Sequence, residues 1–323
     1  MTETGDIHSW AEWQDLDLGE TAWLIPGLLE VGGGGLVHGG PRAYKSFLLL
    51  QLCLDLAAGY GVLGVFLPVP AKRTLMFQAE GTKRAWKNRL VALQEEYPAE
   101  IPFWSRHTSL EKFDSAQGDK RMRAALELIR PDLVVLDPIA EFLEGADTDA
   151  VSVQRWTGVI NGWRERAGCA VVLVHHDRQP LRFASQGGMT TLDAGMEESR
   201  GHTRLTAWAD LVLGVKRKDD VTTVRVQKVR DSVDGQEFQF RLVNGKLVLA
   251  SRSDALEQAV LQVVVKEMWF SEAMHAVCEI LNAQERTVRR AIDRLVTRGE
   301  LDRVTAGGRF RLKPKSDKQG GEK

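Results

Sequence analysis

Short apolar runs alternate along the first two thirds of the chain with longer segments of helical periodicity. The apolar runs cover residues 36–39, 73–80, 133–137 and 169–177, and each ends in or beside a polar residue. The segments between them, at residues 47–58, 83–96, 119–129 and 151–166, predict helices. Continuous aliphatic runs are typical of strands buried on both faces. The alternation therefore predicts an α/β fold, a mostly parallel sheet with helices on both faces.

The pattern changes after residue 177. Residues 178–199 contain Gly, Thr and Ser with weak periodicity, which predicts a long loop, and a short helix to residue 208 follows. Alternating apolar positions then predict strands at residues 210–216, 222–227, 238–243 and 246–249, the last two joined by an Asn-Gly turn. We expect these strands to extend the sheet in antiparallel fashion.

The last seventy residues have a pattern of their own. Helices are predicted at residues 255–268 and 271–281, and a third begins after Asn282, with Glu285 completing a capping box. A hairpin is predicted at residues 299–312. Three helices followed by a hairpin resemble a winged helix. The predicted domains are residues 1–250 for the α/β core, 251–312 for the winged helix and 313–323 for a disordered tail.

The third C-terminal helix is rich in arginine. Arg286 and Arg290 lie opposite its apolar stripe, flanked by Arg289 and Arg294, and Arg309 follows in the hairpin. Basic residues outnumber acidic ones about two to one between residues 284 and 318, a pattern typical of phosphate-backbone binding. These five arginines are the candidate DNA contacts of the module. The alternative is a winged helix used for protein contacts, with solvated arginines.

Composition narrows the class of protein without naming it. The chain has 323 residues and a formal net charge of −1, so any basic surface must be local. Its three cysteines lie far apart in apolar stretches and read as free thiols of a reducing compartment. No apolar run is long enough for a membrane span, and the first residues do not resemble a signal peptide. We expect a cytoplasmic protein.

The first strand runs into a turn that ends in Lys-Ser. Residues 39–46 read GGPRAYKS, and an almost wholly apolar helix follows. Glycines allow backbone N–H groups to approach phosphates at a helix N-terminus. Lys45 would reach the β- and γ-phosphates of a nucleotide, and Ser46 would bind Mg²⁺. The predicted nucleotide-binding residues are Gly39, Gly40, Pro41, Arg42, Ala43, Tyr44, Lys45, Ser46 and Phe47.

Tyr44 departs from the pattern G-x-x-x-x-G-K-S/T, which has glycine at that position. Because the position opens the helix, we expect a residue with negative φ to be tolerated there. The alternative interpretation is a glycine-rich turn with an exposed lysine. The separate run of glycines at residues 32–35 is expected to form the turn before the strand.

Two other strands end in carboxylates. Residues 133–137 read LVVLD, so Asp137 is the second candidate Mg²⁺ ligand, and Pro138 occupies the position where many ATPases carry a water-activating Glu. Glu80, at the tip of another strand, is the best-placed general base. His176 ends a fourth strand, and a polar sensor of the γ-phosphate fits it better than a metal ligand does.

The order of these motifs resembles RepA-type plasmid and phage helicases, which are AAA-like ATPases of the RecA and DnaB class. The resemblance covers residues 20–245, and its motifs lie at residues 23–29, 39–46, 77–81, 133–138, 171–176, 200–210 and 227–230. It implies a RecA-like ATPase that binds ATP and Mg²⁺, forms a ring hexamer and translocates on single-stranded DNA.

The resemblance also implies roles for single residues. Glu80 would activate water, Asp137 would support Mg²⁺ and His176 would sense the γ-phosphate. Lys228 and Arg230 resemble a Lys-x-Arg pair that reaches the neighbouring subunit's ATP. The loop at residues 178–199, with Arg178 and Arg182, resembles a DNA-contacting loop at the ring centre.

Three other functions stay open on the sequence. A recombination mediator or helicase loader would share the core. A DNA-binding regulator with a degraded nucleotide site would not be an enzyme, and Tyr44 is its best support. A metabolic P-loop kinase is not supported by the winged helix or the Lys-x-Arg pair.

Overall fold

The computed structural model of the chain describes most of its 323 residues. The described residues are 8–17, 19, 21–107, 112–145, 149–177, 182–185, 188–191, 199–230, 234–250, 252–264, 266–281, 283–306 and 309–314.

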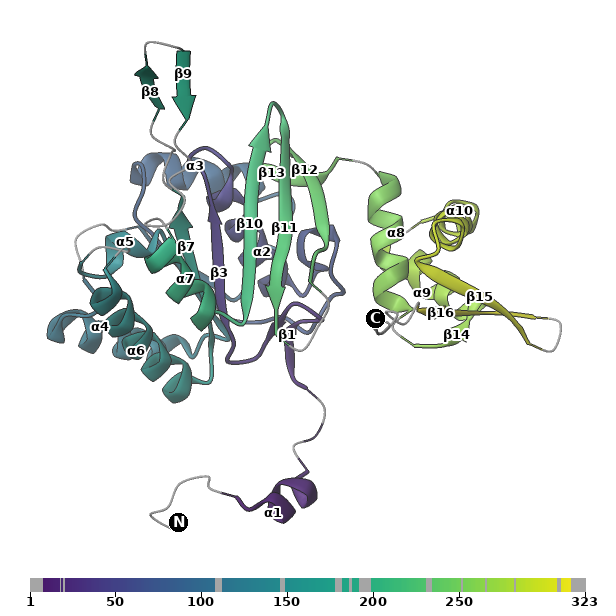
Figure 1. Ribbon diagram of the computed structural model, residues 1–323, viewed down its shortest axis with the longest axis horizontal. Coiled ribbons are helices and arrows are strands. Elements are labelled where there is room, and N and C mark those ends of the chain that lie inside the picture. Colours follow the sequence, from purple (N-terminus) through teal and green to yellow (C-terminus); the bar gives the residue numbers. More distant parts are fainter. Residues whose placement is uncertain are drawn as a thin grey trace.

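A nine-stranded sheet forms the centre of the molecule (Figure 1), in the order β13-β12-β11-β10-β3-β7-β6-β4-β5. The strands from β10 to β5 run parallel, and β11, β12 and β13 are added in antiparallel fashion. Their bounds are β3 (Gly34–Gly39), β4 (Thr74–Gln78), β5 (Phe103–His107), β6 (Leu133–Asp137), β7 (Ala170–His176), β10 (Leu211–Lys218), β11 (Val221–Val229), β12 (Glu237–Val243) and β13 (Lys246–Leu249). A small antiparallel pair, β1 (Trp23–Ile25) and β2 (Leu29–Glu30), precedes the sheet.

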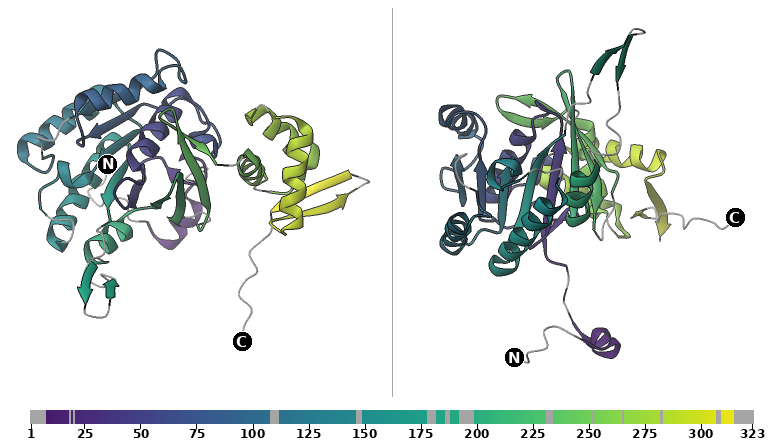
Figure 2. Two further views of the ribbon diagram at one scale, coloured as in Figure 1. Left: turned by 90° about the horizontal axis from the view of Figure 1, so that it is seen from above. Right: turned by 60° about the vertical axis from the view of Figure 1, so that its left-hand side comes forward.

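Helices cover both faces of this sheet (Figure 2). One apolar cluster packs α2, the 3₁₀ turn η1 and α3 on one face, and a second packs α4, α5, α6 and α7 on the other. Their bounds are α2 (Lys45–Ala58), η1 (Val62–Gly64), α3 (Lys83–Leu93), α4 (Ala116–Ile129), α5 (Ile139–Phe142), α6 (Ala150–Ala167) and α7 (Ser199–Trp208). The predicted α/β fold with a mostly parallel sheet is therefore confirmed.

Helix α2 is buried on nearly all sides, as its apolar sequence predicts. It ends at Gly59, which adopts the left-handed conformation that favours glycine. The polar side chain of Gln51 inside this helix is also buried. Its amide nitrogen donates to O of Leu247 at 3.1 Å, and its amide oxygen accepts from N of Leu247 at 2.7 Å. These two bonds join α2 directly to strand β13.

The C-terminal elements pack around a separate apolar cluster. They are α8 (Arg252–Val263), β14 (Met268–Trp269), α9 (Phe270–Leu281), α10 (Glu285–Thr297), β15 (Leu301–Ala306) and β16 (Arg309–Pro314). The three strands form an antiparallel sheet in the order β14-β16-β15. Val288, Ala291, Ile292 and Leu295 give α10 its buried stripe. This arrangement of three helices with a β-hairpin agrees with the winged helix expected from the sequence.

Several boundaries differ from the sequence-based expectations. Residues 178–199 are not a loop throughout, because β8 (Arg182–Ser185) and β9 (Gly188–Thr191) pair as an antiparallel hairpin. This hairpin projects from the body at the top of Figure 1. Gly34 and Gly35 belong to strand β3 and not to the turn before it. Strand β5, at one end of the sheet, begins at Phe103.

Two expectations about the C-terminal helices are wrong. Helix α8 ends at Val263, five residues before the predicted end, at a run of β-branched valines that favours extended structure. Helix α10 begins at Glu285 with Gln284 as its N-cap, without a side-chain hydrogen bond, so the N-cap predicted at position 282 is wrong. Asn282 itself and most of the predicted disordered tail lie outside the described residues.

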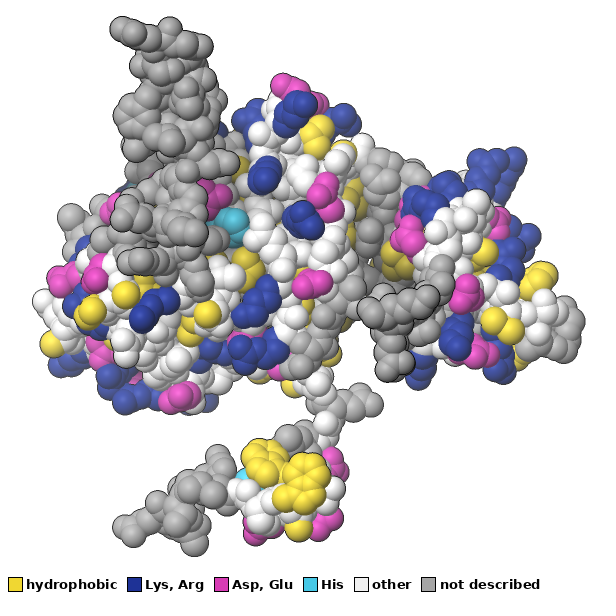
Figure 3. All heavy atoms as spheres, in the orientation of Figure 1, with side chains coloured by type: hydrophobic (Ala, Val, Ile, Leu, Met, Phe, Trp, Pro, Cys, Tyr) yellow, Lys and Arg dark blue, Asp and Glu magenta, His cyan; other side chains and the backbone are white. Residues whose placement is uncertain are grey.

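The first helix, α1 (Trp10–Asp15), stands away from the sheet (Figures 1 and 2). It begins at Ser9 in a complete capping box with Glu12. Trp10 and Trp13 are 78 % and 51 % exposed, and hydrophobic side chains are visible on this helix in Figure 3. In the described part of the chain, none of the helices combines the length and the apolar character that crossing a bilayer requires.

Candidate active site

The candidate catalytic and phosphate-binding residues lie at the carboxyl ends of four adjacent strands, at one edge of the sheet. Strand β3 leads into residues 39–46, β7 ends at His176, β6 ends at Asp137, and Glu80 follows β4 by two residues. Since β3, β7, β6 and β4 are consecutive and parallel, these groups share the edge where ligands of open α/β sheets bind.

The loop between β3 and α2 keeps the conformation of a phosphate cradle. Gly39 has φ +156°, and a Cβ atom there would lie only 2.1 Å from O of Val215 in β10, so the position requires glycine. Arg42 and Tyr44 have φ +60° and +66°. Left-handed residues within such a turn aim successive N–H groups into one concavity, an arrangement that binds anions.

The positive φ of Tyr44 corrects the expectation that this residue has negative φ. The left-handed conformation costs a residue with a Cβ atom roughly 1–2 kcal/mol. Strain of this kind persists where the surroundings enforce it, most often at functional sites. The loop therefore keeps its shape without the usual glycine.

Lys45 is 4 % exposed, and its ammonium group lies inside the loop. Nζ donates to O of Gly39 at 2.7 Å and to O of Gly40 at 2.9 Å, and it lies 3.1 Å from Nδ1 of His176. Burial lowers the pKa of Lys45, against the attraction of Asp137, Asp177 and Glu80. Its partners are carbonyl groups and an imidazole, so the lysine can exchange these bonds for phosphate oxygens.

Asp137 is fully buried, and neither of its carboxylate oxygens has a well-aligned hydrogen-bond partner. Burial raises the pKa of Asp137 to about 6, although the Ser46 hydroxyl and the Lys45 ammonium favour its ionised form. An orphaned buried carboxylate beside a hydroxyl is the oxygen donor set that Mg²⁺ prefers. Ser46 and Asp137 therefore fit the metal of a Mg²⁺-nucleotide complex, and they are the residues that would hold it.

Glu80 and His176 are paired. Oε1 of Glu80 lies 3.0 Å from Nε2 of His176. The Glu80 carboxylate is about half exposed, so a water molecule can reach it. Two accessible carboxylates act on Lys45, Glu80 and Asp177. Asp177 contacts Nδ1 of His38, and Asp137 is buried, so Glu80 is the candidate general base.

One group of residues at this edge was not predicted from the sequence. His38, directly before Gly39, contacts Oδ1 of Asp177 through Nδ1 at 2.9 Å and Oε1 of Gln227 through Nε2 at 2.7 Å. Burial lowers the pKa of His38, but the hydrogen bonds with Asp177 and Gln227 outweigh it and the net shift is upward. Only the position of His38 next to the loop signals this in the sequence, since its partners are 139 and 189 residues away.

Lys228 and Arg230 lie away from the loop, at the other end of β11. The Arg230 backbone N–H donates to O of Asp210, and its Nε lies 3.1 Å from Oδ1 of Asp210. Asp210 in turn accepts from N of Gly34. Gly34 precedes Gly39 by five residues, about 16 Å along a strand.

Lys228 has intramolecular partners. Its Nζ donates to O of Thr206 at 2.9 Å and to O of Ala209 at 2.6 Å, at the C-terminal end of α7. Burial and repulsion by Arg230 lower the pKa of Lys228. A role at a neighbouring nucleotide requires Lys228 to leave these carbonyl groups, whereas Arg230 is exposed and held by a single carboxylate.

The candidate DNA contacts divide into three groups. Arg178 lies outside the described residues, and the same is true of the side chains of Arg182 and Arg309. Arg286, Arg289 and Arg290 are exposed on α10.

Arg294 is different, because its guanidinium group pairs with the buried carboxylate of Glu257 in α8, as does that of Arg298. The charge of Arg294 is therefore already used inside the module, where it ties α10 to α8. Arg289 is partly engaged as well, since its guanidinium carbon lies 5.5 Å from the centre of the Phe270 ring.

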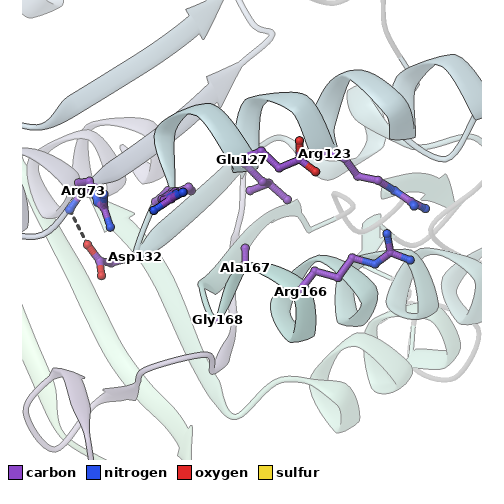
Figure 4. Close-up of a pocket in the computed structure, with 10 residues that line it drawn as sticks. Arg73, Arg123, Glu127, Asp132, Arg166, Ala167 and Gly168 are labelled. Carbon is purple, nitrogen blue, oxygen red and sulfur yellow. Dashed lines mark hydrogen bonds between the residues drawn. The ribbon is translucent and has the colours of Figure 1, made fainter.

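A cavity of about 480 Å³ lies at the N-terminal ends of strands β4, β6 and β7, opposite the ends that carry the candidate site. Figure 4 shows Arg73 and Asp132 at one end of it and Arg123 and Arg166 at the other. Its walls include the C-terminal ends of α4 and α6. The helix dipoles there are unfavourable for anions and favourable for the arginine side chains that line the cavity. The cavity takes no part in the phosphate site.

A parallel sheet, a phosphate-binding loop and an orphaned aspartate at the end of a neighbouring strand define a P-loop nucleoside triphosphatase. A family model described as an AAA domain matches residues 3–182, more than half of the chain. The chain belongs to this AAA domain family, whose members are P-loop ATPases with a RecA-like core. Among curated proteins, no match to the chain is found.

Proposed function

We propose that this ATPase is a DNA-dependent motor, a ring-forming replicative helicase of the RepA type that serves a plasmid, phage or integrated element. The observation that carries the proposal is the combination, in one chain, of a hydrolytic P-loop site with a module whose exposed helix face is rich in arginine. ATP hydrolysis would then be coupled to movement along DNA.

The hydrolytic step is assigned to groups at the edge of the sheet. Lys45 and the loop N–H groups bind the phosphates, and Ser46 and Asp137 hold Mg²⁺, which neutralises charge on the phosphates when it is bound. Glu80 accepts a proton from the attacking water. His176, which contacts both Lys45 and Glu80, would detect the γ-phosphate.

Arg230 is assigned to the ATP of a neighbouring subunit. It is exposed and about 16 Å along the sheet from its own loop. A ring in which each site receives Arg230 from the next chain satisfies this geometry, with Lys228 supporting the segment that carries it.

DNA binding is assigned to two places. The β8–β9 hairpin leaves the sheet at the same edge as the nucleotide site, which favours contact with a single strand at a ring centre. Arg286, Arg289 and Arg290 on α10 favour contact with phosphate backbones.

A non-enzymatic regulator is disfavoured by one observation. Tyr44 is its best support, but Tyr44 adopts the left-handed conformation that a glycine at this position would favour. A helicase loader or recombination mediator shares the core, and it would differ by lacking unwinding activity.

The test is the steady-state ATPase rate with and without single-stranded DNA, measured for the wild type and for Glu80→Gln. We expect turnover to rise on adding DNA. In Glu80→Gln we expect it to fall by about a hundredfold or more while ATP binding is retained, since a general base contributes 10²–10⁴-fold. Glu95→Gln, an exposed carboxylate beyond α3, is the matched control and should leave the rate unchanged. An ATPase rate that does not change on adding DNA, or that is unchanged in Glu80→Gln, would contradict the proposal.

A further inference from the structure

A ladder of aromatic and guanidinium groups stands beside the phosphate loop. Arg217 near the end of β10 lies over the Tyr44 ring, with 4.2 Å between its guanidinium carbon and the ring centre. The Tyr44 ring meets the Phe47 ring edge to face, with the centres 5.6 Å apart. Arg89 of α3 lies 4.6 Å above the Phe47 ring. Four side chains therefore form one continuous series of contacts past the start of α2.

Tyr44 is an unexpected residue for this position. Its backbone is left-handed, a conformation that favours glycine and costs other residues about 1–2 kcal/mol. The ring is partly buried between Arg217 and Phe47. Phosphate binding uses the backbone N–H groups of the loop and does not require this ring. Phosphate binding therefore does not explain why an aromatic side chain stands at this position.

The order of the strands shows which end of a nucleotide reaches the stack. His176, Asp137 and Glu80 come from β7, β6 and β4, all on one side of β3. Strand β10, which carries Arg217, lies on the other side of β3. A nucleoside triphosphate is a linear molecule. If its γ-phosphate lies by Glu80, its α-phosphate lies by the start of α2 and its nucleoside points toward β10.

We infer that Tyr44 and Arg217 form the stacking platform for the nucleobase, with the purine of ATP lying on the outer face of the Arg217 guanidinium group. The inference rests on the nucleotide site proposed above and assigns its base end. Arg217 is exposed, and its Nε donates to O of Asp219 at 2.9 Å, which restrains the guanidinium group beside the Tyr44 ring. Tyr44 backs the guanidinium group from the loop side. Purines stack well on planar guanidinium and aromatic groups.

The platform can be separated from the phosphate site by comparing two ligands. ADP carries a base, and inorganic tripolyphosphate carries phosphates alone. Both are titrated calorimetrically with Mg²⁺ into the full-length wild type, Arg217→Ala and the control Arg225→Ala, an exposed arginine on the neighbouring strand β11. We expect Arg217→Ala to weaken ADP binding about tenfold, the size of one lost stacking contact, and to leave tripolyphosphate binding unchanged.

Tyr44→Phe tests the supporting ring without a change of shape. Because stacking uses the ring and not the hydroxyl, this variant should bind ADP as the wild type does, whereas Tyr44→Ala should weaken ADP binding more than tripolyphosphate binding. Equal losses for the two ligands in Arg217→Ala would overturn the platform and assign Arg217 to phosphates. Binding of neither ligand would refute the nucleotide site itself, a distinct outcome.

Discussion

The imidazole of His176 lies 3.0 Å from the carboxylate of Glu80, although their strands, β7 and β4, are separated by β6. The other ring nitrogen, Nδ1, faces the ammonium group of Lys45 at 3.1 Å. An ammonium group can only donate, so Nδ1 accepts and Nε2 carries the proton that it donates to Glu80. Through this tautomer the phosphate-binding lysine and the proposed general base share one neutral intermediary.

Replacing His176 should therefore reduce turnover more than nucleotide binding. We expect His176→Ala to lower kcat about a hundredfold, the cost typical of losing one positioned donor, with little change in ADP affinity. His176→Gln, which can accept and donate through its amide, should recover part of the rate. Rapid-quench kinetics and calorimetry give the two quantities. An equal loss in both variants, or a loss confined to affinity, would argue against a role in positioning Glu80.

Asp137 should limit the stability of the ligand-free protein. Its pKa in the fold, about 6, is above the ordinary value of 3.8. The fold therefore bears the cost of a buried charge above pH 6, and this cost disappears as the pH falls from 6 toward 3.8. Asp137→Asn should raise the free energy of unfolding at pH 8 by up to about 3 kcal/mol, and by less at pH 5. It should also abolish Mg²⁺-dependent ATP hydrolysis. Urea denaturation at both pH values measures the difference.

Asp55 is the matched contrast for Asp137, because burial also raises its pKa to about 6. Its carboxylate accepts from N of Leu63 and from the Tyr97 hydroxyl, both at 2.7 Å. Asp55→Asn should therefore destabilise the protein by about 1–3 kcal/mol through lost hydrogen bonds. If both asparagine variants changed stability in the same direction, the distinction between an orphaned and a satisfied carboxylate would not hold.

The trans role of Arg230 predicts complementation between two inactive chains. Arg230→Ala should bind ATP but lose DNA-stimulated turnover, since its own loop is intact. In a verified mixed oligomer with Glu80→Gln, some interfaces combine an intact Glu80 with an intact Arg230, so part of the activity should return. Arg225→Ala, on the same strand, is the control and should keep full activity alone. A mixed oligomer without recovered turnover would speak against Arg230 acting across an interface.

The arginines of α10 should differ in what their loss changes. Removing both Arg286 and Arg290 should reduce the slope of log affinity against log salt by about 2, if each contacts one phosphate. Arg294→Ala should instead lower the stability of the C-terminal module, because Arg294 pairs with buried Glu257. DNA binding measured between 50 and 200 mM salt, beside thermal unfolding, separates the two effects. Unchanged salt dependence in the double variant would favour a module that binds protein.

The sequence was sufficient for the sheet and for the position of several candidate site residues in it, because both depend on local patterns. Aliphatic runs ending in Asp137 and His176 are strands by composition alone, and Lys45 and Ser46 follow a strand and open a helix. The parallel sheet then brings these residues to one edge. The position of Glu80 beside them follows from the same reasoning, since it lies just after a strand.

Other features depend on contacts that no local pattern encodes. Tyr44 and Arg217 are 173 residues apart, and the φ of Tyr44 is set by the closure of the loop. The carbonyl partners of Lys228 lie at the C-terminal end of α7, and Glu257 of α8 forms an ion pair with Arg294 of α10. Lys228 and Arg294 thus have partners on other elements that the sequence pattern did not predict.

The double hydrogen bond of Gln51 has a mechanical consequence. It fastens the helix that begins at the phosphate loop to the last strand of the sheet, and the C-terminal module starts within three residues of that strand's end. If α2 tilted slightly on phosphate binding, the two hydrogen bonds of Gln51 would transmit that movement directly to β13. Movement at the nucleotide site would then reach the C-terminal module, which carries the arginine-rich helix α10, within one chain and without a neighbouring subunit.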